Sequence, residues 1–118
     1  MSNLTYKGYY ARIEFDPGDM IFVGRIAGID DIVSFHADNA NALIAAFHEG
    51  VDDYIAACAK IGKSPDKPYS GKLMFRVDPE IHAQAALAAK LTGQSLNTWA
   101  ANVLRESAKS VTGKAVEV

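Results

Sequence analysis

The short segment from Lys63 to Pro68 constrains the fold of this chain more than any other part of it. It places two prolines, Pro65 and Pro68, within six residues, among charged and small neighbours. Proline fixes its own φ and biases the preceding residue toward extended backbone, so a helix that enters this segment ends there. The segment therefore predicts a linker at 63–68 that divides the 118 residues into two domains, 1–68 and 69–118.

The two predicted domains differ in charge. Residues 1–68 contain six Lys and Arg against ten Asp and Glu, whereas residues 69–118 contain six against four. An acidic half joined to a basic half indicates two separate tasks. The basic half suits a polyanion, and the acidic half suits a basic partner.

The composition places the chain among ordinary globular proteins. Hydrophobic residues make up 49% and charged residues 22%, and no apolar run approaches the roughly 20 residues that span a bilayer. The first residues lack the charged-then-apolar layout of a signal peptide. The single cysteine, Cys58, excludes an internal disulfide framework and a Cys-rich zinc site. We therefore expect a cytoplasmic protein that does not contact a membrane.

Strand patterns fill the first part of the N-terminal domain. Between residues 4 and 15, apolar and polar side chains alternate, which is typical of a half-buried strand. A Pro-Gly turn at 16–19 separates this strand from a second one at 20–26, and a third short strand is expected at 32–36. These patterns predict a three-stranded antiparallel sheet.

Residues 39–61 change to a helical period. Their apolar residues recur at three- and four-residue steps, at Ala40, Leu43, Ile44, Phe47, Val51, Tyr54, Ile55 and Cys58. Asp38 or Asn39 is suited to cap the start of this helix, and Gly62 to follow its end. An amphipathic helix beside a sheet buries one face of each, so the fold class is α+β.

The C-terminal domain reads as a strand followed by two helices. The strand covers 72–77, and a helix begins after Asp78 with Pro79 in its first turn. Gly93 ends this helix near residue 91 or 92, and Ser95 caps a second one. The tail from about Lys109 is expected to fray.

Strand, helix, turn and helix in about 37 residues form a ribbon-helix-helix unit. A lone strand leaves its backbone groups unpaired, and so small a core is too thin to be stable alone. Two copies solve both problems if their strands pair antiparallel over four intertwined helices, so we expect a homodimer, with further association of dimers left open. Its shared core would contain three strand residues and a stripe from each helix: Leu73, Phe75, Val77, Ile81, Ala85, Ala88, Leu91, Leu96, Trp99 or Ala100, Val103 and Leu104.

The opposite face of the paired strands presents Lys72, Met74 and Arg76, twice each. The major groove of DNA admits a two-stranded ribbon, where Arg and Lys reach guanine and Met contacts a thymine methyl. The start of the second helix, at Ser95 and Asn97, suits a backbone phosphate. The sequence thus predicts DNA binding through these five residues.

Two longer stretches resemble HicB antitoxins. The C-terminal stretch is Ser70-Gly71-Lys72-Leu73-Met74-Phe75-Arg76-Val77-Asp78-Pro79-Glu80-Ile81-His82 followed by Gly93-Gln94-Ser95-Leu96-Asn97. The N-terminal half is also similar, with Phe22-Val23-Gly24 and a helix carrying Val51-Asp52-Asp53-Tyr54. The resemblance covers about residues 6–107. Many family members carry a polar residue on the ribbon where this chain has Met74, so the family does not fix the base sequence read here.

The resemblance implies a partial ribonuclease-H-like N-domain that binds and blocks a small HicA toxin, an mRNA-cleaving ribonuclease with a double-stranded-RNA-binding-like fold and a catalytic histidine. It also implies that the ribbon-helix-helix domain represses the promoter of the operon. On the acidic helix of the N-domain, Asp52 and Asp53 are the candidate toxin contacts.

Six carboxylates raise the alternative of a metal-dependent nuclease: Glu14, Asp16, Asp19, Asp30, Asp31 and Asp38. Most lie at turns, where Asp bonds local backbone, and the sequence shows no set converging as a two-metal site requires. His36, His48 and His82 have no ligand spacing with one another or with Cys58. We therefore expect no catalytic residues, metal or cofactor.

The expected function is a non-catalytic antitoxin that neutralises a HicA-type toxin and represses its own operon by binding operator DNA. The alternative is a stand-alone ribbon-helix-helix regulator whose N-domain binds another partner or ligand. A short basic open reading frame directly beside the gene distinguishes the two, since only the antitoxin requires it.

Overall fold

The computed structural model describes residues 2–29, 31–65 and 69–118. The chain divides into two compact units, which we call unit 1 and unit 2. Unit 1 contains Met1–Ser70 together with Ala115–Val118, and unit 2 contains Gly71–Lys114. None of the helices in the described part of the chain is long and apolar enough to cross a membrane.

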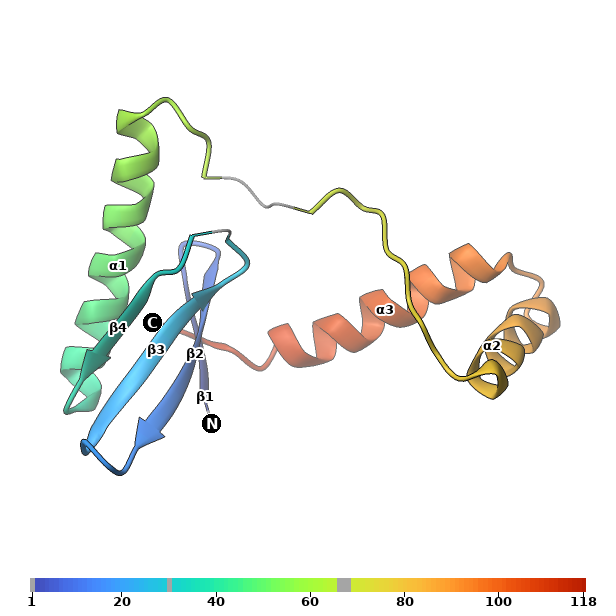
Figure 1. Ribbon diagram of the computed structural model, residues 1–118, viewed down its shortest axis with the longest axis horizontal. Coiled ribbons are helices and arrows are strands. Elements are labelled where there is room, and N and C mark those ends of the chain that lie inside the picture. Colours follow the sequence, from blue (N-terminus) through green and yellow to red (C-terminus); the bar gives the residue numbers. More distant parts are fainter. Residues whose placement is uncertain (1, 30, 66–68) are drawn as a thin grey trace. The chain divides into compact units, whose positions relative to one another are not determined.

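Unit 1 is a five-stranded sheet with one helix, α1, against one of its faces (Figure 1). The strands lie in the order β4-β3-β2-β1-β5. Their bounds are β1 Ser2–Tyr6, β2 Tyr9–Asp16, β3 Ile21–Ala27, β4 Ser34–Ala37 and β5 Val116–Glu117. The first four strands pair antiparallel, and β5 pairs parallel to β1. The α+β class is confirmed.

The prediction of three strands is wrong in two places. The first error lies in the region 4–15, which forms part of a tight hairpin rather than one strand. Lys7 and Gly8 form the turn with φ of 51° and 79°, and Tyr6 pairs with Tyr9 across it. A two-residue turn with both central φ values positive matches the twist of a hairpin. The sequence signal was weak because Lys, unlike Asn or Asp, is not typical of the left-handed position.

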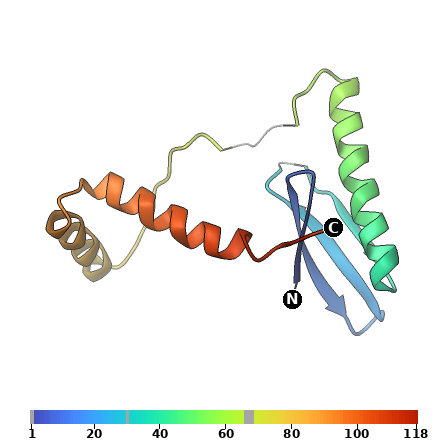
Figure 2. The same ribbon diagram turned by 180° about the vertical axis from the view of Figure 1, so that it is seen from behind.

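The second error concerns the end of the chain. The segment from about Lys109 is not frayed: the last helix continues to Thr112, and residues 116–117 then join the sheet beside β1 (Figure 2). A strand of two residues is too short to show any alternation, so the pattern of the sequence carries no sign of it.

The register of the strands separates the two faces of the sheet. Ala11, Ile13, Ile26 and Phe35 are buried toward α1, while the side chains between them are exposed on the open face. On the helix, the buried residues follow the predicted stripe: Leu43, Phe47, Val51, Tyr54 and Cys58. The rings of Phe35 and Phe47 stack at 5.4 Å between centroids, at the centre of this core.

Both ends of α1 (Ala40–Lys60) match the sequence prediction. Asn39, rather than Asp38, is the N-cap, and its side chain accepts a hydrogen bond of 2.8 Å from the Ala42 amide. At the other end Gly62 has φ of 69°, and the Lys63 amide donates to the Cys58 carbonyl at 2.9 Å. This is the left-handed helix ending for which glycine is preferred.

Gly24 in β3 allows the core to close over the sheet. A Cβ at this position would overlap the ring of Phe35 and lie 2.8 Å from Cδ1 of Ile13. The ring of Phe35 therefore occupies the volume that a side chain at position 24 would need, which explains the glycine inside a strand.

Unit 2 contains two helices, α2 (Pro79–Leu91) and α3 (Leu96–Thr112). Asp78 stands at the N-cap of α2 without a side-chain cap bond, and Gly93, with φ of 72°, follows the end of this helix. The bounds agree with the prediction, and Ser95 caps α3 as expected.

The predicted inner stripe of unit 2 is largely exposed in the single chain. Within α2 only Ala89 is buried, whereas Leu91 is 78% exposed, and α3 has no buried residue. The inner face assigned to Ile81 and Leu91 belongs to a core shared by two chains, so it stays a prediction. The main contact of α2 with another helix or strand is with α3, and much of the apolar surface of both helices stays exposed.

Candidate nucleic-acid and protein interfaces

The segment 72–77 is extended, but it pairs with no strand in the part of the chain that the structure describes. Its six residues are all exposed, with Met74 at 98% and Phe75 at 62%. An extended segment with apolar side chains in water and no neighbouring strand is unstable alone. The predicted ribbon strand therefore stays a prediction that requires a second chain.

The two sides of this segment face different surroundings. A groove of about 610 Å³ runs between the segment and the two helices of unit 2. It is lined by the odd-numbered residues of the segment and by one side of each helix: Leu73, Phe75, Val77, Ile81, His82, Ala85, Leu96, Asn97, Ala100 and Ala101. Lys72, Met74 and Arg76 do not line it. This lining agrees with the expected alternation, although Met74 and Arg76 border a second, shallower hollow together with Phe75, Val77 and His82.

Ser95 and Asn97 open α3. The Ser95 hydroxyl accepts a hydrogen bond of 3.1 Å from the Thr98 amide and lies 2.9 Å from the Thr98 hydroxyl, so its side chain is used by its own helix. Asn97 is exposed and borders the groove. The first amides of a helix have no intrahelical acceptors and favour an anion, so the backbone here, rather than the Ser95 side chain, suits a phosphate.

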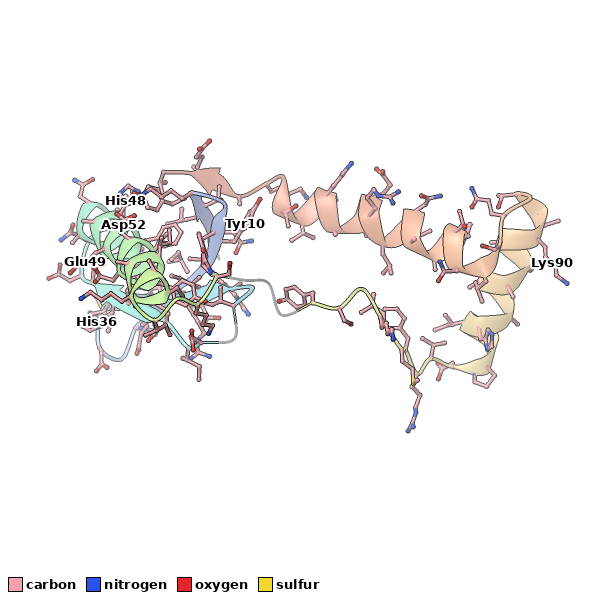
Figure 3. All side chains as sticks on the ribbon, turned by 90° about the horizontal axis from the view of Figure 1, so that it is seen from above. Tyr10, His36, His48, Glu49, Asp52 and Lys90 are labelled. Carbon is pink, nitrogen blue, oxygen red and sulfur yellow. The ribbon has the colours of Figure 1, made fainter. Side chains whose placement is uncertain are left out.

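The acidic side of α1 carries the candidate toxin contacts (Figure 3). Asp52 is held within unit 1, because Lys7 Nζ lies 2.8 Å from Asp52 Oδ1 and the Tyr6 hydroxyl lies 3.2 Å from both carboxylate oxygens. The hydrogen bond from Lys7 lowers the pKa of the Asp52 carboxyl, and the same bond raises the pKa of Lys7. Asp53 and Glu49 are exposed and have no side-chain partner among the described residues.

Asp52 and Asp53, which the sequence proposes as a pair, therefore differ. Asp52 joins α1 to the β1–β2 turn, while the carboxylate of Asp53 is exposed and has no partner among the described residues. The sequence gives no sign of the Lys7–Asp52 contact, since the two residues are 45 positions apart and follow no shared pattern.

The other candidate side chains have local roles in the described part of unit 1. The Asp16 carboxylate accepts from the Gly18 amide at 2.9 Å, as expected of a turn residue. Glu14 pairs with Arg12, Asp31 with Lys63, and Asp38 accepts from the side chain of Asn39. Asp19 lies in the same turn as Asp16, and Asp30 lies outside the described residues.

The histidines and the cysteine are separate from one another. The His48 ring stacks on Tyr6 with 3.9 Å between the ring centroids, and its buried Nε2 has no hydrogen-bond partner within the described part of the chain. His36 and His82 are exposed. Cys58 is buried beside Tyr54, where burial and a hydrogen bond with Cys58 raise the pKa of Tyr54 to about 12. Across residues 2–29, 31–65 and 69–118, no group of three or more His, Cys, Asp or Glu is placed to hold a metal ion.

A comparison with protein families gives a match over residues 54–104, which run from the last turns of α1 through the segment 72–77 and most of α3. The matching family is HicB. The match spans less than half of the chain and supports membership of the HicB family, and it suggests a role related to toxin–antitoxin systems. Neither the curated proteins nor the solved structures contain a match to this chain.

Proposed function

We propose that this chain is an antitoxin of the HicB kind. In this proposal unit 1 binds and neutralises a small mRNA-cleaving toxin of the HicA kind, and unit 2 forms a dimer that binds operator DNA and represses the operon. The observation that carries the proposal is the HicB match over 54–104, because it covers the extended segment and most of both helices of unit 2.

The exposed apolar surface of unit 2 supports the dimer. Leu73, Phe75 and Val77 border a groove whose other walls are helical, yet each stays exposed in a single chain. A second copy of 72–77, paired antiparallel, would give this segment a strand partner and cover these side chains. The four helices of two chains would then share one ribbon-helix-helix core, large enough to be stable where one chain is not.

The other side of the ribbon supports DNA binding. Lys72, Met74 and Arg76 lie outside the groove, so in a dimer they would form the outer face of a two-stranded ribbon. Arginine grips a guanine edge at two points, lysine acts as a mobile point charge, and methionine offers an apolar contact. The start of α3, at Ser95 and Asn97, would hold a backbone phosphate and fix the register on the duplex.

Charge supports the assignment of the toxin to unit 1. A protein that cleaves RNA has to present a positive surface to phosphates, and such a surface complements the acidic side of α1. Asp53 and Glu49 are the exposed carboxylates there, and Asp52 contributes a charge already shared with Lys7. The mixed sheet, antiparallel in its first four strands and with one helix on one face, is compatible with a partial ribonuclease-H-like domain. Unit 1 would act by covering the toxin, without chemistry or cofactor of its own.

The test is to look for a small open reading frame directly beside the gene and to express its product with and without this chain. We expect the toxin alone to stop growth and the pair to grow. Asp53→Lys should reduce the rescue of growth from the toxin while preserving operator binding. Arg76→Ala should weaken operator binding while preserving the rescue of growth. Arg105→Ala, which removes another exposed arginine of unit 2, is the matched control and should preserve both. A chain that binds operator DNA but neutralises no neighbouring product would instead be a stand-alone regulator.

A further inference from the structure

The outer edge of β1 is occupied by a very short piece of the chain's own C-terminal end. β5 pairs parallel to β1 at two positions, Leu4 with Val116 and Thr5 with Glu117. The Val118 amide then donates to the Thr5 carbonyl at 3.0 Å. β1 itself contains five residues, and all five pair with β2 on its other side. The edge of β1 is therefore a regular strand that is longer than the strand now paired with it.

β5 has little to hold it in place. Val116 and Glu117 are both exposed, Val116 at 59%, and the apolar contact of the segment with the core comes from Val118. A ladder of two residue pairs with one half-buried side chain stabilises the docked state only slightly. Docked and released forms of such a strand exchange readily.

β1 also lacks the features that prevent other strands from pairing with an edge. Its sequence, Ser-Asn-Leu-Thr-Tyr, contains no charged residue and no proline. Natural edge strands are protected by lysines, prolines or bulges, or are covered by another element. Among the described residues of the sheet the cover is β5 alone, and an edge without further protection is a template for another extended segment.

We propose that the edge of β1 is a strand-addition site, which β5 occupies in the free protein and which an extended segment of the protein partner of unit 1 takes over. This inference rests on the proposed function, because the partner is the toxin assigned to unit 1. A second copy could also pair here through its own β1, but the edge adjoins the surface assigned to the toxin, because the hydroxyl of Tyr6, the last residue of β1, lies 3.2 Å from the Asp52 carboxylate on the acidic side of α1. A partner segment of five residues pairs along the whole of β1, with side-chain specificity from alternate positions.

A consequence follows for the link between the two units. Unit 2 is joined to unit 1 at two points of the chain, through the residues before Gly71 and through β5. Displacement of β5 removes the second connection, so toxin binding and the freedom of unit 2 are coupled. Linkage makes this coupling reciprocal: the factor by which bound toxin favours release of β5 equals the factor by which release of β5 increases the affinity for the toxin. A change in unit 2 that pulls β5 away therefore favours toxin binding.

The first test needs no toxin. Val118→Pro in the full chain removes the amide that donates to Thr5, whereas Val118→Ala, the matched control, keeps it. The probe is a peptide with the sequence of residues 113–118, titrated to roughly millimolar concentration because a free two-residue ladder binds weakly. We expect the peptide to bind the proline variant more tightly than the alanine variant or the unaltered chain, and to slow amide hydrogen exchange at Asn3 and Thr5, which share the outer edge of the strand. Failure to protect these amides in a folded proline variant would overturn the site.

The second test uses a HicA-type toxin inactivated at its catalytic histidine. If β5 occupies the edge about nine-tenths of the time, its release should tighten toxin binding by about tenfold. Equal or weaker binding by the Val118→Pro chain, with α1 and the sheet intact by circular dichroism, would show that toxin and β5 do not compete. Absence of toxin binding to every form would contradict the proposed function, while the peptide experiment would still decide whether the edge accepts a strand.

Discussion

Replacement of Gly24 by alanine should destabilise unit 1 strongly, although alanine adds only one methyl group. The added Cβ would overlap the Phe35 ring and lie 2.8 Å from Ile13 Cδ1. Phe35 cannot move inward, because its ring stacks on Phe47, which is fully buried. Overpacking of a closed core costs about 1–3 kcal/mol, and the absence of space behind Phe35 places this variant at the upper end, about 3 kcal/mol.

Gly50 provides the matched control for this variant. A Cβ at Gly50 would meet Val33 Cγ1 at 3.7 Å and Ile26 Cδ1 at 3.9 Å, which are ordinary contacts. Because Gly50 lies inside α1, its replacement by alanine should stabilise unit 1 by about 0.5–1 kcal/mol. The same substitution, made at two glycines of one core, should therefore have opposite signs.

Urea unfolding of the full chain measures both variants. All five tyrosines lie in residues 1–70 and the single tryptophan, Trp99, lies in unit 2. Near-ultraviolet dichroism of tyrosine therefore reports unit 1, and tryptophan fluorescence reports unit 2. We expect the tyrosine transition to move to lower urea for Gly24→Ala and to higher urea for Gly50→Ala. A Gly24→Ala chain as stable as the unaltered one would refute the packing of Phe35 over β3.

Three further predictions concern the proposed interfaces and one ion pair. Phe75→Ala should weaken the dimer by about 3 kcal/mol or more, as for a buried aromatic, and sedimentation at micromolar concentration would detect this; a compact monomer of the unaltered chain would contradict it. Arg76→Ala should lose about 1–3 kcal/mol of operator-binding free energy and relax the base preference at particular operator positions. Lys72→Ala should weaken binding to all DNA and lower the slope of log affinity against log salt concentration by about one. Unchanged affinity of both variants for operator and scrambled DNA would refute the ribbon face. Lys7 lowers the pKa of Asp52, so the stability that this pair adds is present above the ordinary value of 3.8 and disappears as the pH falls through the lower pKa of the folded state. Urea unfolding at a series of pH values should therefore show Lys7→Met less stable than the unaltered chain at pH 6 and equal to it at the acid end. A difference that persists at the acid end would contradict the pairing.

The parts of the fold that follow from local chemistry could be predicted from the sequence. The apolar period, the Asn39 cap and Gly62 predict α1. Pro79, Gly93 and Ser95 predict the bounds of α2 and the start of α3. Each of these signals acts over a few residues, where propensity and capping decide the outcome.

The features that the sequence did not reveal depend on contacts between distant residues. The pairing of β5 with β1 joins positions more than 100 apart, and the Lys7–Asp52 ion pair joins a turn to a helix. The hairpin at Lys7–Gly8 was missed for a local reason, since its left-handed turn uses a residue that rarely adopts that conformation.

The prediction for unit 2, unlike those for unit 1, concerns contacts between two chains and not within one. Its alternation of apolar and polar side chains over 72–77 describes a face that one chain leaves exposed, and the separation of Met74 and Arg76 from the groove agrees with that alternation. The pattern thus indicates which side of the segment needs a cover, and in the proposed dimer a second chain would supply it.

The central claim, that two chains pair through 72–77, can be tested by one distance. Met74→Cys in a Cys58→Ala background gives a single site for a spin label. In an antiparallel ribbon with Phe75 facing the core, position 74 of one chain lies directly or diagonally opposite position 74 of the other chain. Their backbones should then be about 5–8 Å apart. The account predicts strong dipolar broadening of the electron paramagnetic resonance spectrum, abolished by dilution with unlabelled chain. A folded dimer without broadening, or with labels well beyond about 20 Å, would show that the chains associate elsewhere and would contradict the ribbon.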